Sequence, residues 1–139
     1  MKINIISETN RRIPRKKIQI LLAIMEEDEE PPDSTLNLIF IRDSRMARLN
    51  KDFRNLNKAT DVLSFNIDNE SGFNSVFGEI YISTDMALKN LKLFGGTYYS
   101  EILRLCCHGF LHLLGYDHGD NKSRTRMQKR ENYFLGKLI

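Results

Sequence analysis

The histidines of this chain are the residues whose type and spacing most clearly suggest chemistry. All three lie in the segment HGFLHLLGYDH, as His108, His112 and His118. Residues four apart share one face of a helix, so the first two imidazoles can bind the same metal ion. Gly115 can end that helix and let the chain turn back, which would bring His118 to the same point. Zinc held by three protein ligands keeps an open position, where the pKa of bound water falls to about 7.

The spacing H-x3-H-x2-G-x2-H also occurs in metzincin metalloproteases, which leaves a metalloprotease-like hydrolase open. Those enzymes carry a glutamate general base directly after the first histidine, whereas this chain has Gly109 there. The sequence therefore predicts that the peptidase machinery is incomplete. The alternative to a metal site is that the histidines have a structural role and are hydrogen-bonded within a core. If the histidines bind a metal, Asp117 and Glu101 are candidates to accept the remaining ring N–H groups.

The hydrophobic pattern predicts the elements that must position these side chains. Isoleucine-rich and alternating segments predict strands, and apolar stripes at helical spacing predict helices. The second helix is expected to bury Met46, Leu49 and Phe53. The short connection between the third and fourth strands predicts antiparallel pairing and an α+β domain with a mixed sheet. The predicted strands are 2–7, 35–41, 61–67 and 78–83, and the predicted helices begin near Pro14 and Asp43 and cover 84–94, 100–114 and 121–136.

Length and composition limit the classes of protein. The chain has 139 residues and 16.2 kDa, which predicts one domain over residues 1–139. Hydrophobic residues make up 41% and charged residues 28%, so collagen-like and disordered classes are excluded. The net charge of +3 permits a polyanionic partner without requiring one. We see no membrane span or secretory leader, and the adjacent Cys106 and Cys107 favour a reducing compartment, so a cytoplasmic location is expected.

Three motifs make the chain resemble the YbeY-type ribosomal RNA maturation endoribonucleases. The histidine segment matches the family signature H-G-x-L-H-L-x-G-Y-D-H. Residues 50–65, NKDFRNLNKATDVLSF, resemble the block N-x-x-[FY]-R-x-x-x-x-x-T-D-V-L-S-F. Residues 78–83, GEIYIS, resemble G-D-I-x-I-S, with Glu79 in place of the usual aspartate. Together the three blocks span most of the chain from about Leu36 to Met127.

The resemblance implies a fold, a cofactor and an activity. It implies a four-stranded mixed sheet packed with helices, a zincin-like metal-binding helix, and one zinc ion on His108, His112 and His118. It implies a single-strand-specific endoribonuclease that matures the 3′ end of small-subunit (16S) ribosomal RNA and acts in ribosome quality control. Single-stranded ribosomal RNA, the small subunit and its assembly factors are the implied partners. Three imidazoles also suit nickel, cobalt or copper, so another divalent transition metal stays open.

The resemblance also places the family's functional arginine on Arg54, as a catalytic residue. The residue itself fits that role, because a planar guanidinium binds phosphate oxygens through two parallel hydrogen bonds. The structural alternative is an ordinary surface arginine. Lys58 is expected to hold the RNA backbone, and Asp61 and Ser64 are candidates to contact the site.

A function of another class also remains open. A small basic protein can bind ribosomal RNA electrostatically, so the chain could be a non-catalytic ribosome assembly factor with a structural metal. Removing the metal discriminates between the two, because a structural ion stabilises the fold whereas a catalytic ion is needed for turnover.

Overall fold

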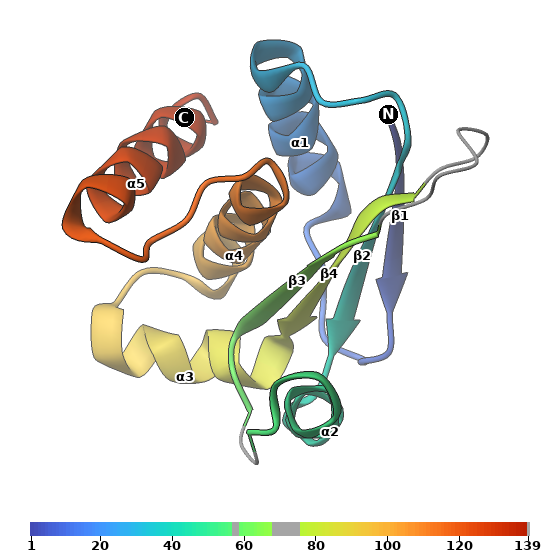
Figure 1. The fold of residues 1–139 in the computed structure, drawn as a ribbon. Helices are drawn as coiled ribbons and strands as arrows, with labels where there is room; N and C mark the ends of the chain where they lie inside the picture. The colour runs from blue at the N-terminus through green and yellow to red at the C-terminus, as the bar shows by residue number, and fades with distance from the viewer. Residues whose placement is uncertain (57–58, 68–75, 139) are drawn as a thin grey trace.

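A computed structural model describes residues 1–56, 59–67 and 76–138, so Lys58 and the connection over 68–75 lie outside the described residues. Strands and helices alternate in the first part of the chain, and three helices follow the last strand (Figure 1). The elements are β1 (Lys2–Ser7), α1 (Arg15–Glu29), β2 (Thr35–Ile41), α2 (Asp43–Arg54), β3 (Val62–Asn66), β4 (Val76–Ser83), α3 (Thr84–Phe94), α4 (Tyr98–Leu113) and α5 (Asn121–Gly136).

The four strands form one mixed sheet in the order β1-β2-β4-β3. β1 pairs with β2 and β2 with β4 in parallel, whereas β3 pairs with β4 in antiparallel. The predicted antiparallel pair, the four-stranded mixed sheet and the α+β class are therefore confirmed. β3 ends up at one edge of the sheet, and residues of this edge strand line the cleft described below.

The two faces of the sheet carry separate hydrophobic clusters because side chains alternate along each strand. On β2, Leu38 and Phe40 pack into the larger cluster, and Ile39 and Ile41 pack into the smaller one. The larger cluster includes residues of α1, α3, α4 and α5, and the smaller one includes Met46 and Leu49 of α2 together with Leu63 of β3. Figure 1 shows the corresponding arrangement, with α2 away from α1, α4 and α5.

Helix α4 is the central helix among those that pack into the larger cluster. It contacts α1, α3 and α5 as well as β3 and β4. Its N-terminus begins with a reciprocal cap, in which the Ser100 backbone N–H donates to the Thr97 side chain and the Thr97 backbone N–H donates to the Ser100 side chain. Fully buried side chains such as Ile102 and Phe110 anchor the helix, each contributing about 1.5–3 kcal/mol through burial.

The prediction that Phe53 is buried is wrong. Met46 and Leu49 do face the sheet, but 66% of Phe53 is exposed. The reason is its position, since α2 ends one residue later at Arg54 and Phe53 contacts the edge strand through Phe65. Within the described residues, no helix combines the length and the apolar character that crossing a membrane requires.

Candidate functional site

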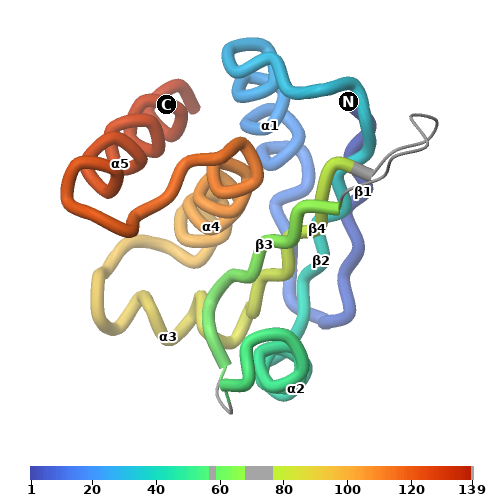
Figure 2. The backbone as a smooth tube through the Cα atoms, viewed as in Figure 1, coloured from blue at the N-terminus to red at the C-terminus, as the bar shows by residue number. Residues whose placement is uncertain are grey.

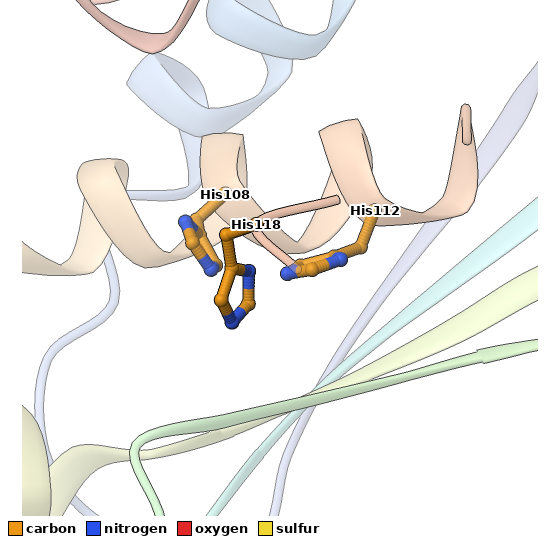
Figure 3. A group of neighbouring side chains, drawn as sticks. All are labelled: His108, His112 and His118. Atoms are coloured by element: carbon orange, nitrogen blue, oxygen red, sulfur yellow. The ribbon is translucent and has the colours of Figure 1, made fainter. Parts of the chain in front are cut away.

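The three imidazoles converge on one point in front of α4 (Figure 3). The ring centroids of His108 and His112 are 4.8 Å apart, and that of His118 lies 5.9 Å and 5.0 Å from them, respectively. One nitrogen from each ring lies within 4.8 Å of the other two. Side chains placed in this way can hold one metal ion, because three imidazole nitrogens that share an ion must lie a few ångströms apart.

The connection from α4 to α5 brings His118 to the other two histidines. Gly115 has a φ of +104°, a value that an L side chain rarely adopts, and its N–H donates to the carbonyl of His112 at 3.1 Å. The tube in Figure 2 follows this connection as it leaves α4 and reaches α5. The hydroxyl of Tyr116 donates to Glu29 of α1 at 2.7 Å, and Asp120 caps α5. The expected helix end at Gly115 is thus observed, with the connection fixed on both sides of His118.

A buried carboxylate on α5 orients the first histidine. Nδ1 of His108 lies 3.3 Å from Oε2 of Glu131. A ring that donates from Nδ1 to this carboxylate leaves Nε2 free to bind a metal. The other oxygen of Glu131 lies 3.6 Å from the guanidinium of Arg104, which balances the buried negative charge.

The same arginine joins a wider polar network behind the histidines. Arg104 donates to both oxygens of Glu101 at 2.8 Å, and Asn90 donates to Glu101 at 2.7 Å. Burial alone raises the pKa of Glu101, but the hydrogen bonds from Arg104 and Asn90 outweigh burial, so the pKa lies below its ordinary value. Asn90 also donates to Asp61 at 3.2 Å, which ties the start of β3 to α3 and α4. Glu101 therefore stays ionised as the partner of Arg104.

The surroundings of His112 favour its neutral form. Burial has the largest effect and lowers its pKa, and the neighbouring imidazoles of His108 and His118 lower it further. A metal binds the neutral ring, so the fold keeps this side chain in its binding form at neutral pH.

The histidines line an open cleft together with Arg54. The cleft has a volume of about 580 Å³ and lies between α4 and the edge strand β3. Arg54 is the last residue of α2 and is exposed, so its guanidinium is available to an anion. Asp61 and Ser64 also line the cleft, as the sequence suggested, whereas Lys58 is outside the described residues. Arg54 and the histidines thus share one cleft, although Arg54 comes from the opposite face of the sheet. The other described lining residues are Thr60, Val62, Leu63, Phe65, Asn66 and Leu113.

Gly109 lies where α4 approaches the sheet most closely. A Cβ on this residue would come within 2.7 Å of Ile80 Cγ2 and 3.0 Å of Ser64 Oγ. The Ser64 hydroxyl donates to the Gly109 carbonyl at 3.1 Å, which holds the two backbones together. The position that carries glutamate in HExxH peptidases therefore has no room for a side chain here, which weighs against peptidase chemistry.

Two candidate acceptors chosen from the sequence do not contact His108 in the described structure. Glu101 pairs with Arg104 and Asn90, and Asp117 accepts a hydrogen bond from the backbone of Gly119 at 3.2 Å. The residue that sequence reasoning missed is Glu131, which is far from His108 in the sequence. In the sequence, Glu131 is an acidic residue between the apolar Met127 and Phe134 of the last predicted helix. That position indicates burial but does not identify a partner.

Comparisons with known proteins agree on one family. A family model described as "Endoribonuclease YbeY" matches residues 3–139. A curated relative of that name from Heliobacterium modesticaldum is 36% identical over 129 residues, which is 84% of this chain and 78% of the relative. Another, from Thermodesulfovibrio yellowstonii, is 38% identical over 112 residues, covering 79% of this chain and 70% of the relative.

A solved structure supports the fold over nearly the whole chain. The solution structure of a protein from Thermotoga maritima aligns with a TM-score of 0.67 and 30% sequence identity. The alignment covers 98% of this chain and 88% of the other. The arrangement of helices around the mixed sheet is therefore shared with an experimentally determined relative.

Proposed function

The chain belongs to the YbeY endoribonuclease family, and from this premise we propose that it is a metal-dependent nuclease that cuts single-stranded RNA. The observation that supports this proposal most strongly is the convergence of three imidazoles in the same open cleft as Arg54. Imidazole nitrogens that can bind a cation and a guanidinium that can bind an anion line the same cleft. This arrangement suits hydrolysis of a phosphodiester, in which a metal ion can polarise a phosphate oxygen and a cation can stabilise the developing negative charge.

The donor set fits a transition metal. His108, His112 and His118 offer nitrogen ligands, and the Glu131 carboxylate beside Nδ1 of His108 is the outer partner that metal-binding histidines commonly have. Three imidazoles suit zinc, and we propose one zinc ion per chain. When bound, the ion supplies a Lewis acid that polarises a phosphate oxygen.

Arg54 is proposed to bind the scissile phosphate. Its guanidinium can donate two parallel hydrogen bonds to phosphate oxygens and can neutralise the charge that develops in the transition state. Because Arg54 is exposed at the end of a helix, it can meet the RNA without first breaking a buried ion pair. We therefore assign Arg54 to contact with the substrate and the three histidines to the metal.

The proposed biological substrate is ribosomal RNA, at the 3′ end of the small-subunit RNA, with a further role in ribosome quality control. The small subunit and its assembly factors are the proposed partners. The support is the family resemblance, and the net charge of +3 is compatible with a polyanionic partner. The buried free thiols of Cys106 and Cys107 support the cytoplasm, a reducing compartment, as the location.

The decisive experiment compares cleavage of a single-stranded RNA with cleavage of its duplex. Wild-type protein and His112→Ala are purified identically, and circular dichroism verifies that both are folded. We expect the wild type to cut only the single strand. Removing a residue that hydrogen-bonds to a metal ligand lowers activity by roughly 10- to 100-fold, and we expect His112→Ala, which removes a ligand itself, to lower activity by more than that. Equal cleavage by both proteins would refute the proposed site.

The ends of the products then distinguish two routes of cleavage. A 2′,3′-cyclic phosphate indicates attack by the 2′-hydroxyl of the substrate itself. A 5′-phosphate with a 3′-hydroxyl indicates attack by water. Absence of cleavage, with RNA binding retained, would instead favour the non-catalytic assembly factor.

A further inference from the structure

An exposed aromatic ring lies beside the cleft, next to Arg54 in the chain and in contact with the lining residue Phe65. Phe53 directly precedes Arg54 and has 66% of its surface exposed. Its ring centroid is 5.2 Å from that of Phe65, at an interplanar angle of 54°. Phe65 lies 5.9 Å from Tyr81 in an edge-to-face contact and is itself one of the residues that line the cleft. Three rings therefore lead from β4 through the edge strand to the solvent beside Arg54.

Stability alone gives little reason for Phe53 at this position. A phenylalanine gains free energy by removing its ring from water, and this ring keeps about two thirds of its surface in water. Phe65 is half-buried on the edge strand, so the pair presents aromatic surface next to the cleft. Exposure by itself is no argument, since Phe94 is 78% exposed, and neither Phe53 nor Phe94 is among the described residues that line the cleft. Phe53 differs from Phe94 in its contact with a cleft residue and its place next to Arg54.

We propose that Phe53 and Phe65 form a stacking platform for one base of the RNA strand whose phosphate Arg54 binds. This inference rests on the proposed function and adds the way in which the substrate is recognised. Phe65, which Phe53 contacts, lines the same cleft as Arg54, so an RNA strand whose phosphate Arg54 binds passes beside the two rings. Any base can stack on an aromatic side chain, because every base has a π face.

The platform also accounts for a preference for single strands. In a duplex each base is stacked between its neighbours, and its faces are not available to a protein ring. A base that stacks on Phe53 must first leave that stack, which costs free energy in a duplex and much less in a flexible single strand. The platform would thus select unpaired RNA without reading its sequence.

The experiment measures binding rather than cleavage. The full-length protein is titrated into a fluorescently labelled single-stranded 2′-O-methyl oligonucleotide, and a gel verifies that the oligonucleotide stays intact. Phe53→Ala is expected to bind about 5- to 150-fold more weakly, which corresponds to the roughly 1–3 kcal/mol lost when one base–aromatic stack is removed. Phe53→Tyr keeps an aromatic ring and is expected to bind like the wild type. Phe94→Ala, the matched control, is also expected to leave the affinity unchanged.

A second readout detects the stack directly. The chain has no tryptophan, so Phe53→Trp introduces a single fluorescent indole at the platform. Stacking of a base on this indole is expected to quench its emission when the oligonucleotide binds. In the comparison strand, abasic sites replace all the bases, so that no register offers a base to stack. This strand should not quench the indole, and the removal of the bases should weaken binding to the wild type more than binding to Phe53→Ala.

The outcomes separate this inference from the proposed function. Unchanged affinity of Phe53→Ala together with unquenched Phe53→Trp would overturn the platform, while cleavage of single-stranded RNA by the wild type would leave the proposed function standing. A wild type that neither binds nor cleaves RNA would overturn both. Because Phe53 is largely exposed, the alanine variant should fold normally, and circular dichroism verifies this.

Discussion

The two walls of the cleft are built in opposite ways. The wall on α4 carries His108 and His112 on a helix anchored in the larger hydrophobic cluster, with Glu131 and Arg104 behind the first imidazole. The wall on α2 and β3 carries Arg54 at an exposed helix end beside an edge strand, and the exposed Phe53 lies next to it. One wall is built on a helix packed into the core and is connected to a polar network, whereas the other lies at an exposed helix end.

Under the proposed function, the two walls suit two different tasks. Metal ligands must be held in fixed positions before the ion arrives, which requires packing and outer hydrogen bonds. Groups that contact a flexible RNA strand must be reachable from solvent, so they gain from exposure. Changes in the α4 wall should therefore alter metal affinity and stability together, whereas changes in the α2 wall should alter turnover or RNA binding alone.

The largest effect on turnover is expected from Arg54→Ala. Loss of a group that stabilises transition-state charge costs about 100- to 1,000-fold in turnover. Metal content and thermal stability should stay unchanged, because Arg54 is exposed. Arg54→Lys should recover only part of the activity, since an ammonium group lacks the planar fork. Arg48→Ala, an exposed arginine on the same helix, is the control. A loss of metal in Arg54→Ala would show that the α2 wall also contributes to metal binding.

On the α4 wall, Glu131→Gln is expected to weaken metal affinity by about 10- to 100-fold. The neutral amide cannot orient and polarise His108 as the carboxylate does, and it leaves Arg104 without one of its charged partners. Competition with a coloured chelator measures the affinity. Glu27→Gln changes an exposed glutamate of α1 and should have no effect. Equal affinities in the two variants would mean that Glu131 does not support the metal site.

Gly109→Ala tests the close packing of the α4 wall. The new methyl group would lie 2.7 Å from Ile80 Cγ2, and overpacking of this kind costs about 1–3 kcal/mol. Alanine recovers up to about 1 kcal/mol through its helix propensity, so a net loss of up to about 2 kcal/mol is expected in chemical denaturation. Gly136→Ala in α5 meets no atom within 4 Å and should not destabilise the protein. Unchanged stability of Gly109→Ala would show that α4 can move away from the sheet.

The smallest effect is expected for the pH dependence of the stability of the metal-free protein. Burial, and then the neighbouring imidazoles, lower the pKa of His112 in the folded state, so the unfolded chain takes up a proton at higher pH. The stability of the fold should therefore decrease as the pH falls below about 6.5, the ordinary pKa of histidine. Thermal unfolding after treatment with a chelator measures this, and His112→Ala should show a weaker dependence. The same slope in both proteins would refute a lowered pKa.

Much of the fold could be predicted because its signals are local. The β2 segment TLNLIFI is a clear strand, and the β3–β4 pair follows from a short connection between two strand-like segments. The exposure of Phe53 could not be predicted, because the apolar spacing of α2 does not show where the sheet beside it ends. Helical periodicity specifies a face of the helix, and only the neighbouring element decides whether that face is covered along its whole length.

For the candidate site, the sequence by itself determined that His108 and His112 share a helix face and that Gly115 allows the chain to turn, since backbone geometry fixes both. Only the tertiary structure decided that Glu131 contacts His108, that Gly109 has no room for a side chain, and that Arg54 reaches the histidine cleft from the other face of the sheet. The physical reason is that these contacts join elements far apart in the chain, and their distances depend on how the helices pack against the sheet.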